Sequence, residues 1–484
     1  MNARSLSPRA SELYRRWRSS VGPAFRRSEV RTGETPVPPS GSHTLRLALI
    51  AWLILGAAVS IRTWVRPSSH TVFPIFAASA EHWWGNCSLY ELYPGLDRFR
   101  YPPVFALFVT PFSALGLTAG GILWSWLSIA VLLTGLWQYM RDVIPSTWTR
   151  QRRAVFLLLG ALGALRGLWN AQSNALVAGL VLLGAAALAR AANPSLKRKR
   201  TDAFASGWDW WLTAAFLAVA VCLKLTPLGP VLLLLASWPR QLAWRLLGIM
   251  ATLSLLPFLT RPPDIVIDQY REWIDHLMES GSVRWIGFRD GWTIWIVLQH
   301  LLDGESGVLS LCDPMDSSWY HRVQLATAAA TLGWCLWQRH RAVRFDLGSR
   351  WLVHVTLSMG LAWLMLFGPA VEHATYVFLA PPLLWGLLER SAWPHGRLLI
   401  WASFTLIMVL GWGAVTRLLT PDWPIVLTAL PAGTALFALW LVGYARHCGT
   451  EAERPEPPSS KSPLPISGRL APSTERWNQT TIPS

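Results

Sequence analysis

The apolar residues of this chain come in long, uninterrupted blocks, and this feature limits the possible folds most. Two examples, Ala175 to Ala189 and Leu398 to Gly411, contain no charged residue and are apolar on every side of a helix. Only helices and closed barrels satisfy their backbone hydrogen bonds inside a bilayer. A barrel would show segments of about ten residues that alternate between apolar and polar. The blocks therefore predict an all-α polytopic membrane protein.

Composition agrees with this class. Of the 484 residues, 52% are hydrophobic and 14% are charged, which excludes an ordinary soluble domain. The formal net charge of +16 would indicate nucleic acid binding in a soluble protein. Here Arg and Lys are concentrated in tails and short loops, as is typical of cytoplasmic segments beside anionic lipid. We therefore expect membrane lipids as partners and no nucleic acid. The five cysteines lack metal-binding spacing, so no metal site is predicted.

Two polar tails flank the apolar region. Residues 1–43 and 447–484 are rich in Pro, Ser and charged residues and contain no apolar run long enough to span a membrane. We predict that both are disordered cytoplasmic tails and that 44–446 form one membrane domain.

Within that domain the sequence predicts about twelve membrane-spanning helices, some shorter than the usual twenty residues. They cover approximately residues 44–65, 118–140, 154–169, 173–190, 210–224, 226–237, 245–260, 319–338, 351–368, 373–388, 398–416 and 425–445. The segment from Val104 to Leu115 is short and bounded by prolines, so we interpret it as a re-entrant or interfacial helix.

The distribution of positive charge predicts an orientation. With the amino terminus inside, the Arg152-Arg153 pair, the KRKR run at 197–200 and the arginines at 339, 341 and 344 all lie on the cytoplasmic side. We therefore predict a multi-pass protein of the inner (cytoplasmic) membrane. The same threading places residues 66–103, 169–173, 224–227, 261–291 and 368–373 together on the outer face. The polar residues that look functional thus converge there.

The first outer loop carries an expected interfacial helix. Six residues between 73 and 84 would share one apolar side on the membrane surface: Phe73, Phe76, Ala77, Ala80, Trp83 and Trp84. Glu81 would then project from the polar side. Alternatively, the two tryptophans are interface anchors and Glu81 is a solvated charge.

Further along the same loop, Arg98 and Arg100 precede Tyr101-Pro102-Pro103. Guanidinium groups form forked hydrogen bonds with phosphate oxygens, so this pair could hold a phosphate or diphosphate. Pairing with lipid headgroups is the alternative.

Other polar candidates stand where one apolar block ends and the next begins. Asn170, Gln172 and Asn174 could hydrogen-bond sugar hydroxyls or cap helices. Lys224 follows an apolar run and must reach a polar cavity or an anionic partner. Glu372 and His373 are similarly placed, either as binding residues or as a structural pair. No phosphate-binding glycine-rich loop, zinc motif or nucleophile elbow is present.

Several of these motifs occur in a familiar order. They are Trp84-Gly85 with Leu89-Tyr90, then Tyr101-Pro102-Pro103, the 170–174 segment Asn-Ala-Gln-Ser-Asn, Lys224 with Pro227, and Pro369 with His373. Over about residues 44–445 the chain resembles glycosyltransferase family 87. The resemblance implies the C-type glycosyltransferase fold and a polyprenyl-phosphate sugar as donor, often mannose. The donor is then a substrate, and no separate cofactor is required.

The resemblance also implies a reaction and roles for residues. The sugar would be transferred by an inverting displacement to a glycan or glycolipid acceptor on the outer face. Cations such as Arg100, Lys224 or His373 would meet the donor phosphate, and a carboxylate would deprotonate the acceptor hydroxyl.

One departure concerns that carboxylate. Members of this fold typically carry an Asp early in the first outer loop, but Trp64 to Ala80 contains no Asp or Glu. Glu81 and His70 are the candidate catalytic residues, and Glu81 is favoured. Two alternatives remain: a transporter or flippase of a lipid-linked or small polar substrate, and a catalytically inactive relative.

Overall fold

The computed structural model describes residues 41–68, 71–144, 148–193, 203–280, 292–295, 297, 318–368, 371–389, 394–411 and 424–453. Within these ranges the regular structure is helical throughout, which confirms the predicted class. The predicted tails fall largely outside these residues. Helix α19 nevertheless continues past His447 to Glu453, because the chain has no proline there to end the helix before Pro455.

The first half of the chain supplies the helices that surround the polar residues of interest. Their bounds are α2 (Gly41–Val65), α3 (Phe73–Gly85), α4 (Pro103–Ser113), α5 (Gly116–Asp142), α6 (Arg150–Trp169), α7 (Asn174–Ala191), α9 (Ala203–Leu223), α10 (Leu228–Ser237), α11 (Pro239–Leu255) with the short 3-10 helix η1 (Leu256–Leu259), and α12 (Pro263–Ser280).

The second half completes the bundle. Its elements are α14 (Ser318–Arg344), α15 (Ser349–Phe367), the 3-10 helix η3 (His373–Phe378), α16 (Ala380–Leu388), α17 (Pro394–Phe404), the π-helical segment η4 (Thr405–Leu410) and α19 (Pro424–Glu453).

Within the described ranges, six helical segments are long and apolar enough to cross a membrane, so the chain is a multi-pass membrane protein. They are His43–Val65, Gly116–Asp142, Asn174–Ala191, Pro239–Leu259, Ser349–Phe367 and Thr428–Cys448. Each coincides with one of the twelve predicted spans. The other six predicted spans are helical over most of their described residues but shorter or less apolar, and the end of the span at 398–416 lies outside the described residues, so the count of twelve stays a prediction.

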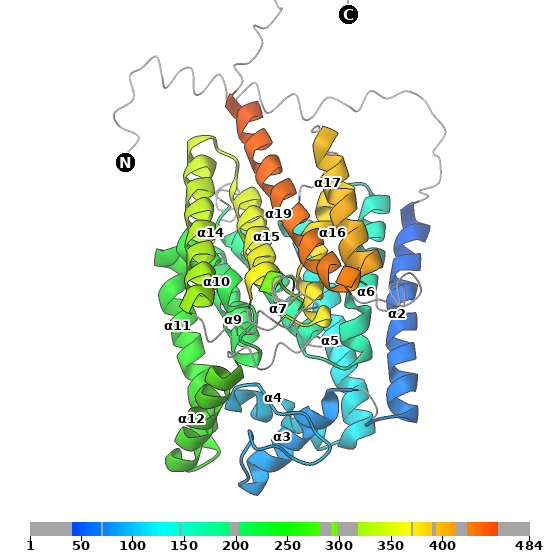
Figure 1. Ribbon diagram of the computed structural model, residues 1–484, viewed down its shortest axis with the longest axis vertical. Coiled ribbons are helices and arrows are strands. Elements are labelled where there is room, and N and C mark those ends of the chain that lie inside the picture. Colours follow the sequence, from blue (N-terminus) through cyan, green and yellow to red (C-terminus); the bar gives the residue numbers. More distant parts are fainter. Residues whose placement is uncertain are drawn as a thin grey trace, which may run out of the picture.

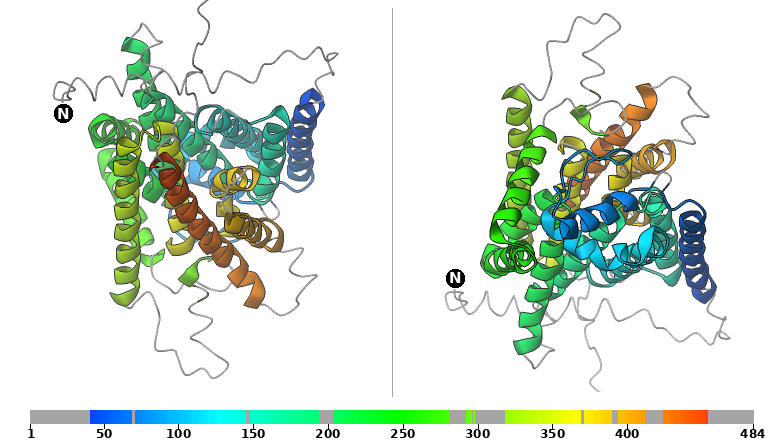
Figure 2. Two further views of the ribbon diagram at one scale, coloured as in Figure 1. Left: turned by 90° about the horizontal axis from the view of Figure 1, so that it is seen from above. Right: turned by 90° about the horizontal axis from the view of Figure 1, so that it is seen from below.

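Helix α7 forms the centre of the bundle, where it packs against α5, α9, α15 and η3. Glycines allow the closest of these approaches. A Cβ atom added to Gly135 of α5 would lie 2.6 Å from the carbonyl oxygen of Gly179 on α7. Small residues permit such close backbone packing between membrane helices. Helix α2 lies instead at the periphery (Figure 2), and its Leu53, Ile54 and Ile61 are exposed, as expected for contact with lipid.

Helices α3, α4 and α12 gather at one end of the bundle (Figure 1). The predicted helix over Phe73 to Trp84 is present as α3, and five of the six residues assigned to its apolar side are buried. Trp84 is the exception and is 50% exposed. The apolar side packs on α4 and α5. It is therefore covered by protein, which corrects the expectation that this side rests on the membrane surface.

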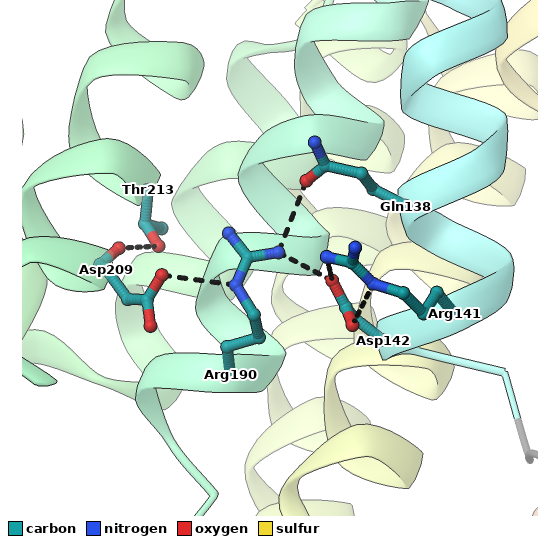
Figure 3. A network of polar contacts seen from close by, with 6 residues as sticks. All are labelled: Gln138, Arg141, Asp142, Arg190, Asp209 and Thr213. Atoms are coloured by element: carbon teal, nitrogen blue, oxygen red, sulfur yellow. Dashed lines mark hydrogen bonds and ion pairs between the residues drawn. The ribbon is translucent and has the colours of Figure 1, made fainter. Parts of the chain in front are cut away.

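A buried ionic network joins three helices at the opposite end of α7 (Figure 3). Arg190 lies 2.6 Å from a carboxylate oxygen of Asp142 on α5 and 3.1 Å from one of Asp209 on α9. It also donates to Gln138, while Arg141 bonds both oxygens of Asp142. Because buried charges are stable only when paired, this network fixes the ends of α5, α7 and α9 relative to one another.

Candidate functional site

Four polar side chains form a continuous hydrogen-bonded chain where α7 begins. Lys224 Nζ donates to Asn174 Oδ1 at 2.7 Å, and Asn174 Nδ2 donates to Gln172 Oε1 at 2.9 Å. Gln172 Nε2 then donates to Glu372 Oε2 at 2.9 Å. We call these four residues the polar relay. All four were singled out from the sequence, and the structure brings them together from three separate segments.

The turn between α6 and α7 positions the two amides. Helix α6 ends in a closed turn, in which the Gln172 N–H bonds the Gly167 carbonyl and the Ala171 N–H bonds that of Leu168. This is the Schellman arrangement, whose central position is usually Gly. Here Ala171 occupies it with a φ of 51°. A non-glycine residue in the left-handed region is strained, and such strain is concentrated at functional sites.

Lys224 is the first residue after α9. The helix ends there because Pro227 cannot continue it and restricts the residue before it. A cation at a helix C-terminus is stabilised by the helix dipole. The ammonium also lies 5.9 Å from the centre of the Tyr101 ring. Lys224 is therefore held between an amide oxygen and an aromatic face.

Tyr101 connects the relay to the first outer loop. Its hydroxyl accepts a hydrogen bond of 3.1 Å from Ser173, and its ring stacks on Phe105 at 4.3 Å. Phe76 of α3 meets Tyr101 edge-on at 5.2 Å and Trp124 of α5 at 5.4 Å. Trp124 in turn donates to the Ala171 carbonyl at 3.0 Å. An aromatic frame thus joins the loop to the strained turn.

The tyrosine at position 90 supports this frame from the loop side. Its hydroxyl donates to the Tyr101 carbonyl at 2.8 Å. Burial raises the pKa of Tyr90 well above its ordinary value, so the hydroxyl keeps its proton and remains a donor. The backbone of Tyr101 is therefore fixed on one side and its hydroxyl on the other.

Glu372 and His373 begin η3, and the structure separates their contacts. Glu372 ends the relay, whereas His373 Nε2 bonds the carbonyl oxygen of Gly411. The His373 ring also lies edge-on to Trp292 at 5.9 Å. His373 Nδ1 is buried and has no hydrogen-bond partner among the described residues. The two neighbours are not a simple structural pair.

The segment between α2 and α4, predicted to be the first outer loop, contacts α12 directly. The Leu89 N–H donates to Gln269 Oε1 at 2.9 Å, and Ser88 donates to Glu272 at 2.5 Å. Arg261, just before α12, bonds the Trp83 carbonyl and the Asn86 side chain. The two long outer segments predicted from the sequence therefore meet at the relay end of the bundle.

The remaining predicted site residues lie apart from the relay contacts. Glu81 is exposed on α3, and Arg100 is exposed beside Tyr101. Asn170 acts through its backbone, because its carbonyl accepts from the Val72 N–H at 2.9 Å and so holds the start of α3. His70 lies outside the described residues. The catalytic roles of Glu81 and His70 stay predictions.

Sequence reasoning missed Trp124, and it assigned no role of their own to Ser173 and Tyr90, which stand within the quoted motifs. All three hold the relay and Tyr101 in place. Ser173 is fully buried beside two amides that were identified, so its position between them was an available signal. Nothing in the sequence marks Trp124 among the 31 tryptophans as the one that reaches the Ala171 carbonyl.

Comparison with known protein families decides the classification. The model of glycosyltransferase family 87 matches residues 99–369, which is more than half of the 484 residues. The chain belongs to glycosyltransferase family 87. The match to family 87 includes Tyr101, Gln172, Asn174 and Lys224 and ends before Glu372, and it begins after Glu81.

Beyond the family 87 match, two solved structures are similar. Both are crystal structures of ArnT from Cupriavidus metallidurans. The one bound to undecaprenyl phosphate is 16% identical, with a TM-score of 0.33, and covers 83% of this chain and 78% of that chain. The apo structure is 15% identical, with a TM-score of 0.42, and covers 82% and 78%. At this likeness neither assigns a ligand or a residue role to this family 87 chain. No curated protein matches the chain.

Proposed function

We propose that this protein is an integral-membrane glycosyltransferase that moves a hexose, with mannose as the first candidate, from a polyprenyl-phosphate carrier to an acceptor on the outer face of the membrane. The acceptor would be a glycan or glycolipid. Membership of glycosyltransferase family 87 supports the class of reaction. The sequence has no nucleotide-binding motif, which fits a donor carried on a lipid.

The polar relay is the observation that carries the proposal. Its cationic end, Lys224, stands at the end of a helix in a membrane bundle and beside the face of Tyr101. A half-buried cation in a membrane bundle, held among the described residues by an amide oxygen and an aromatic face and by no carboxylate, favours an anionic ligand. The phosphate of a lipid carrier entering between helices satisfies that requirement.

The reaction would be a single displacement at the anomeric carbon. The acceptor oxygen forms a bond to that carbon while the bond to the phosphate oxygen breaks, and polyprenyl phosphate leaves. The acceptor proton passes to a general base, for which Glu81 and His70 are the proposed residues. Lys224 stabilises the negative charge that develops on the leaving phosphate. Arg100 and His373 are the further proposed phosphate contacts, and Asn170 is a proposed contact for sugar hydroxyls.

A catalytically inactive relative is the second candidate. The absence of Asp and Glu from Trp64 to Ala80 and the exposure of Glu81 favour it.

One experiment tests the proposal and separates the two candidates. Purified protein in lipid nanodiscs is offered radiolabelled polyprenyl-phosphate mannose or glucose and a lipid extract as acceptor pool, with a nucleotide-linked sugar as the comparison donor. The proposal predicts transfer from the lipid-linked donor only. Donor binding without any transfer would instead favour the inactive relative. If the protein neither binds the donor nor transfers the sugar, both candidates are excluded.

A further inference from the structure

We infer that Glu372 is a positioning residue: its carboxylate, acting through Gln172 and Asn174, orients the ammonium of Lys224 toward the phosphate of the donor. This inference rests on the proposed function, because it takes the lipid phosphate as the ligand of Lys224. It adds a role for a residue that lies outside the family match and whose hydrogen bond, within the described part of the chain, is to Gln172 and not to Lys224.

The relay has one possible direction, and its two ends determine it. An ionised carboxylate only accepts hydrogen bonds and an ammonium only donates them. Gln172 must therefore present its N–H group to Glu372, which leaves its oxygen for the N–H group of Asn174. The oxygen of Asn174 then faces Lys224. Flipping either amide would place two donors or two acceptors against each other.

Burial makes this direction consequential. Asn174 is fully buried, so an amide turned the wrong way could not exchange its lost partner for water. A buried polar group left without a partner destabilises a protein, because its desolvation is not repaid. The hydrogen-bond acceptor at Glu372 thus sets the orientation of two amide side chains and, through them, that of the ammonium.

Lys224 needs such a constraint because its side chain is flexible. A lysine side chain loses rotamer entropy when it is fixed in one geometry. The bond to Asn174 and the Tyr101 face fix the ammonium before any ligand arrives. Of its three N–H groups, one bonds Asn174, and the other two, which have no acceptor among the described residues, can donate to phosphate oxygens. Preorganisation of this kind raises affinity without adding a contact.

A general base is the competing role for Glu372, and one substitution separates the two roles. Glu372→Gln removes the proton-accepting carboxylate but keeps an amide oxygen that can accept from Gln172. Glu372→Ala removes the acceptor altogether. The positioning role predicts that the glutamine variant stays within about threefold of the wild type in donor affinity. The alanine variant should bind donor about ten- to one-hundredfold more weakly, the range for one hydrogen bond to a charged group.

Binding is measured with fluorescent polyprenyl monophosphate and with full-length protein in nanodiscs, and KM and kcat are measured wherever turnover is detected. The positioning role predicts a higher donor KM in Glu372→Ala with a smaller change in kcat. A loss of kcat in Glu372→Gln with unchanged donor affinity would overturn it, because that is the behaviour of a base.

A charge exchange provides a second test that does not depend on turnover. Glu372→Lys and Lys224→Glu should each lower the unfolding temperature. With two lysines at the ends of the relay, two hydrogen-bond donors must face each other at one position, and with two carboxylates, two acceptors must. The double variant Lys224→Glu/Glu372→Lys should recover most of that loss, since both amides can reverse together. It should nevertheless fail to bind polyprenyl monophosphate, because a carboxylate now stands at position 224.

The outcomes separate the inference from the proposed function. If wild-type protein does not bind polyprenyl monophosphate, the proposed function is wrong. If wild-type protein binds it and Lys224→Met does not, but Glu372→Ala binds as tightly as the wild type, only the positioning role is wrong. A double exchange that is no more stable than the single variants would also contradict the directional relay.

Discussion

Lys224 and Asn174, fifty positions apart in the sequence, are joined by a hydrogen bond of 2.7 Å between Nζ and Oδ1. The bond connects the end of α9 to the beginning of α7, the central helix of the bundle. Lys224 is the only lysine among the residues that the structure describes, and the bond fixes it beside Tyr101. The position of this cation therefore depends on one buried amide.

That dependence gives the first prediction. Asn174→Ala should leave both Lys224 and the Gln172 oxygen without a partner and lower the free energy of unfolding by about 1–3 kcal/mol. Donor affinity should fall with it. Thermal unfolding in nanodiscs, followed by binding of polyprenyl monophosphate to the folded fraction, measures both effects. An Asn174→Ala variant as stable and as tightly binding as the wild type would show that the bond does not hold Lys224.

The second prediction concerns the close approach of α5 and α7. Gly135→Ala should destabilise the bundle by about 1–3 kcal/mol, because its Cβ would lie 2.6 Å from the Gly179 carbonyl oxygen and force the helices apart. Gly248→Ala on α11 is the matched control, since nothing lies within 4 Å of the added Cβ there. The unfolding temperature should fall below that of the wild type in Gly135→Ala and rise slightly above it in Gly248→Ala, because alanine favours a helix where no clash occurs.

A third prediction uses the network in Figure 3. Arg190→Met should destabilise the protein by about 3–5 kcal/mol, because it leaves the buried carboxylates of Asp142 and Asp209 without their shared partner. Arg141→Met is the control, since the Arg141 side chain is 57% exposed and its loss should matter little. The network lies about 24 Å along α7 from Asn174, so donor affinity of the folded fraction should not change. Equal effects of the two substitutions would contradict the assigned importance of Arg190.

The fourth prediction concerns pH. Burial lowers the pKa of His82 from its ordinary value of 6.5, and this effect outweighs the opposing influence of Glu81 and Glu91. Folding therefore disfavours the protonated ring. The contribution of His82 to stability is fully present above about pH 6.5 and decreases as the pH falls below it. His82→Gln, which does not titrate, should lose less stability than the wild type between about pH 7.5 and 5.5. Identical pH profiles of unfolding temperature would contradict this sign.

Much of the fold follows from local sequence pattern. Long apolar blocks identify α7 and α15, and the spacing of Phe73, Phe76 and Ala80 identifies α3 and its buried side. The same spacing cannot say what covers an apolar side. The apolar side of α3 is covered by aromatic residues of α4 and α5, whose positions in space the sequence does not give. The expectation that this side contacts the membrane was therefore wrong.

The candidate site was predictable in its members but not in its connections. Gln172, Lys224 and Glu372 stood out because polar side chains are costly between apolar helices. Their order in the relay depends on long-range packing that brings η3 to the α6–α7 turn. The roles of Glu81 and Arg100 could not be inferred in the same way, because both side chains are exposed, and most charged side chains on a protein are exposed.

The most direct test of the central claim is a binding comparison between a lipid phosphate and its alcohol. Wild-type protein, Lys224→Met and the exposed control Arg240→Met are titrated in nanodiscs with polyprenyl monophosphate and with polyprenol. The account predicts that the wild type and Arg240→Met prefer the phosphate by at least about tenfold, the effect of one charge-assisted hydrogen bond, and that Lys224→Met loses this preference. An undiminished preference in Lys224→Met would contradict the assignment of the polar relay as the phosphate site.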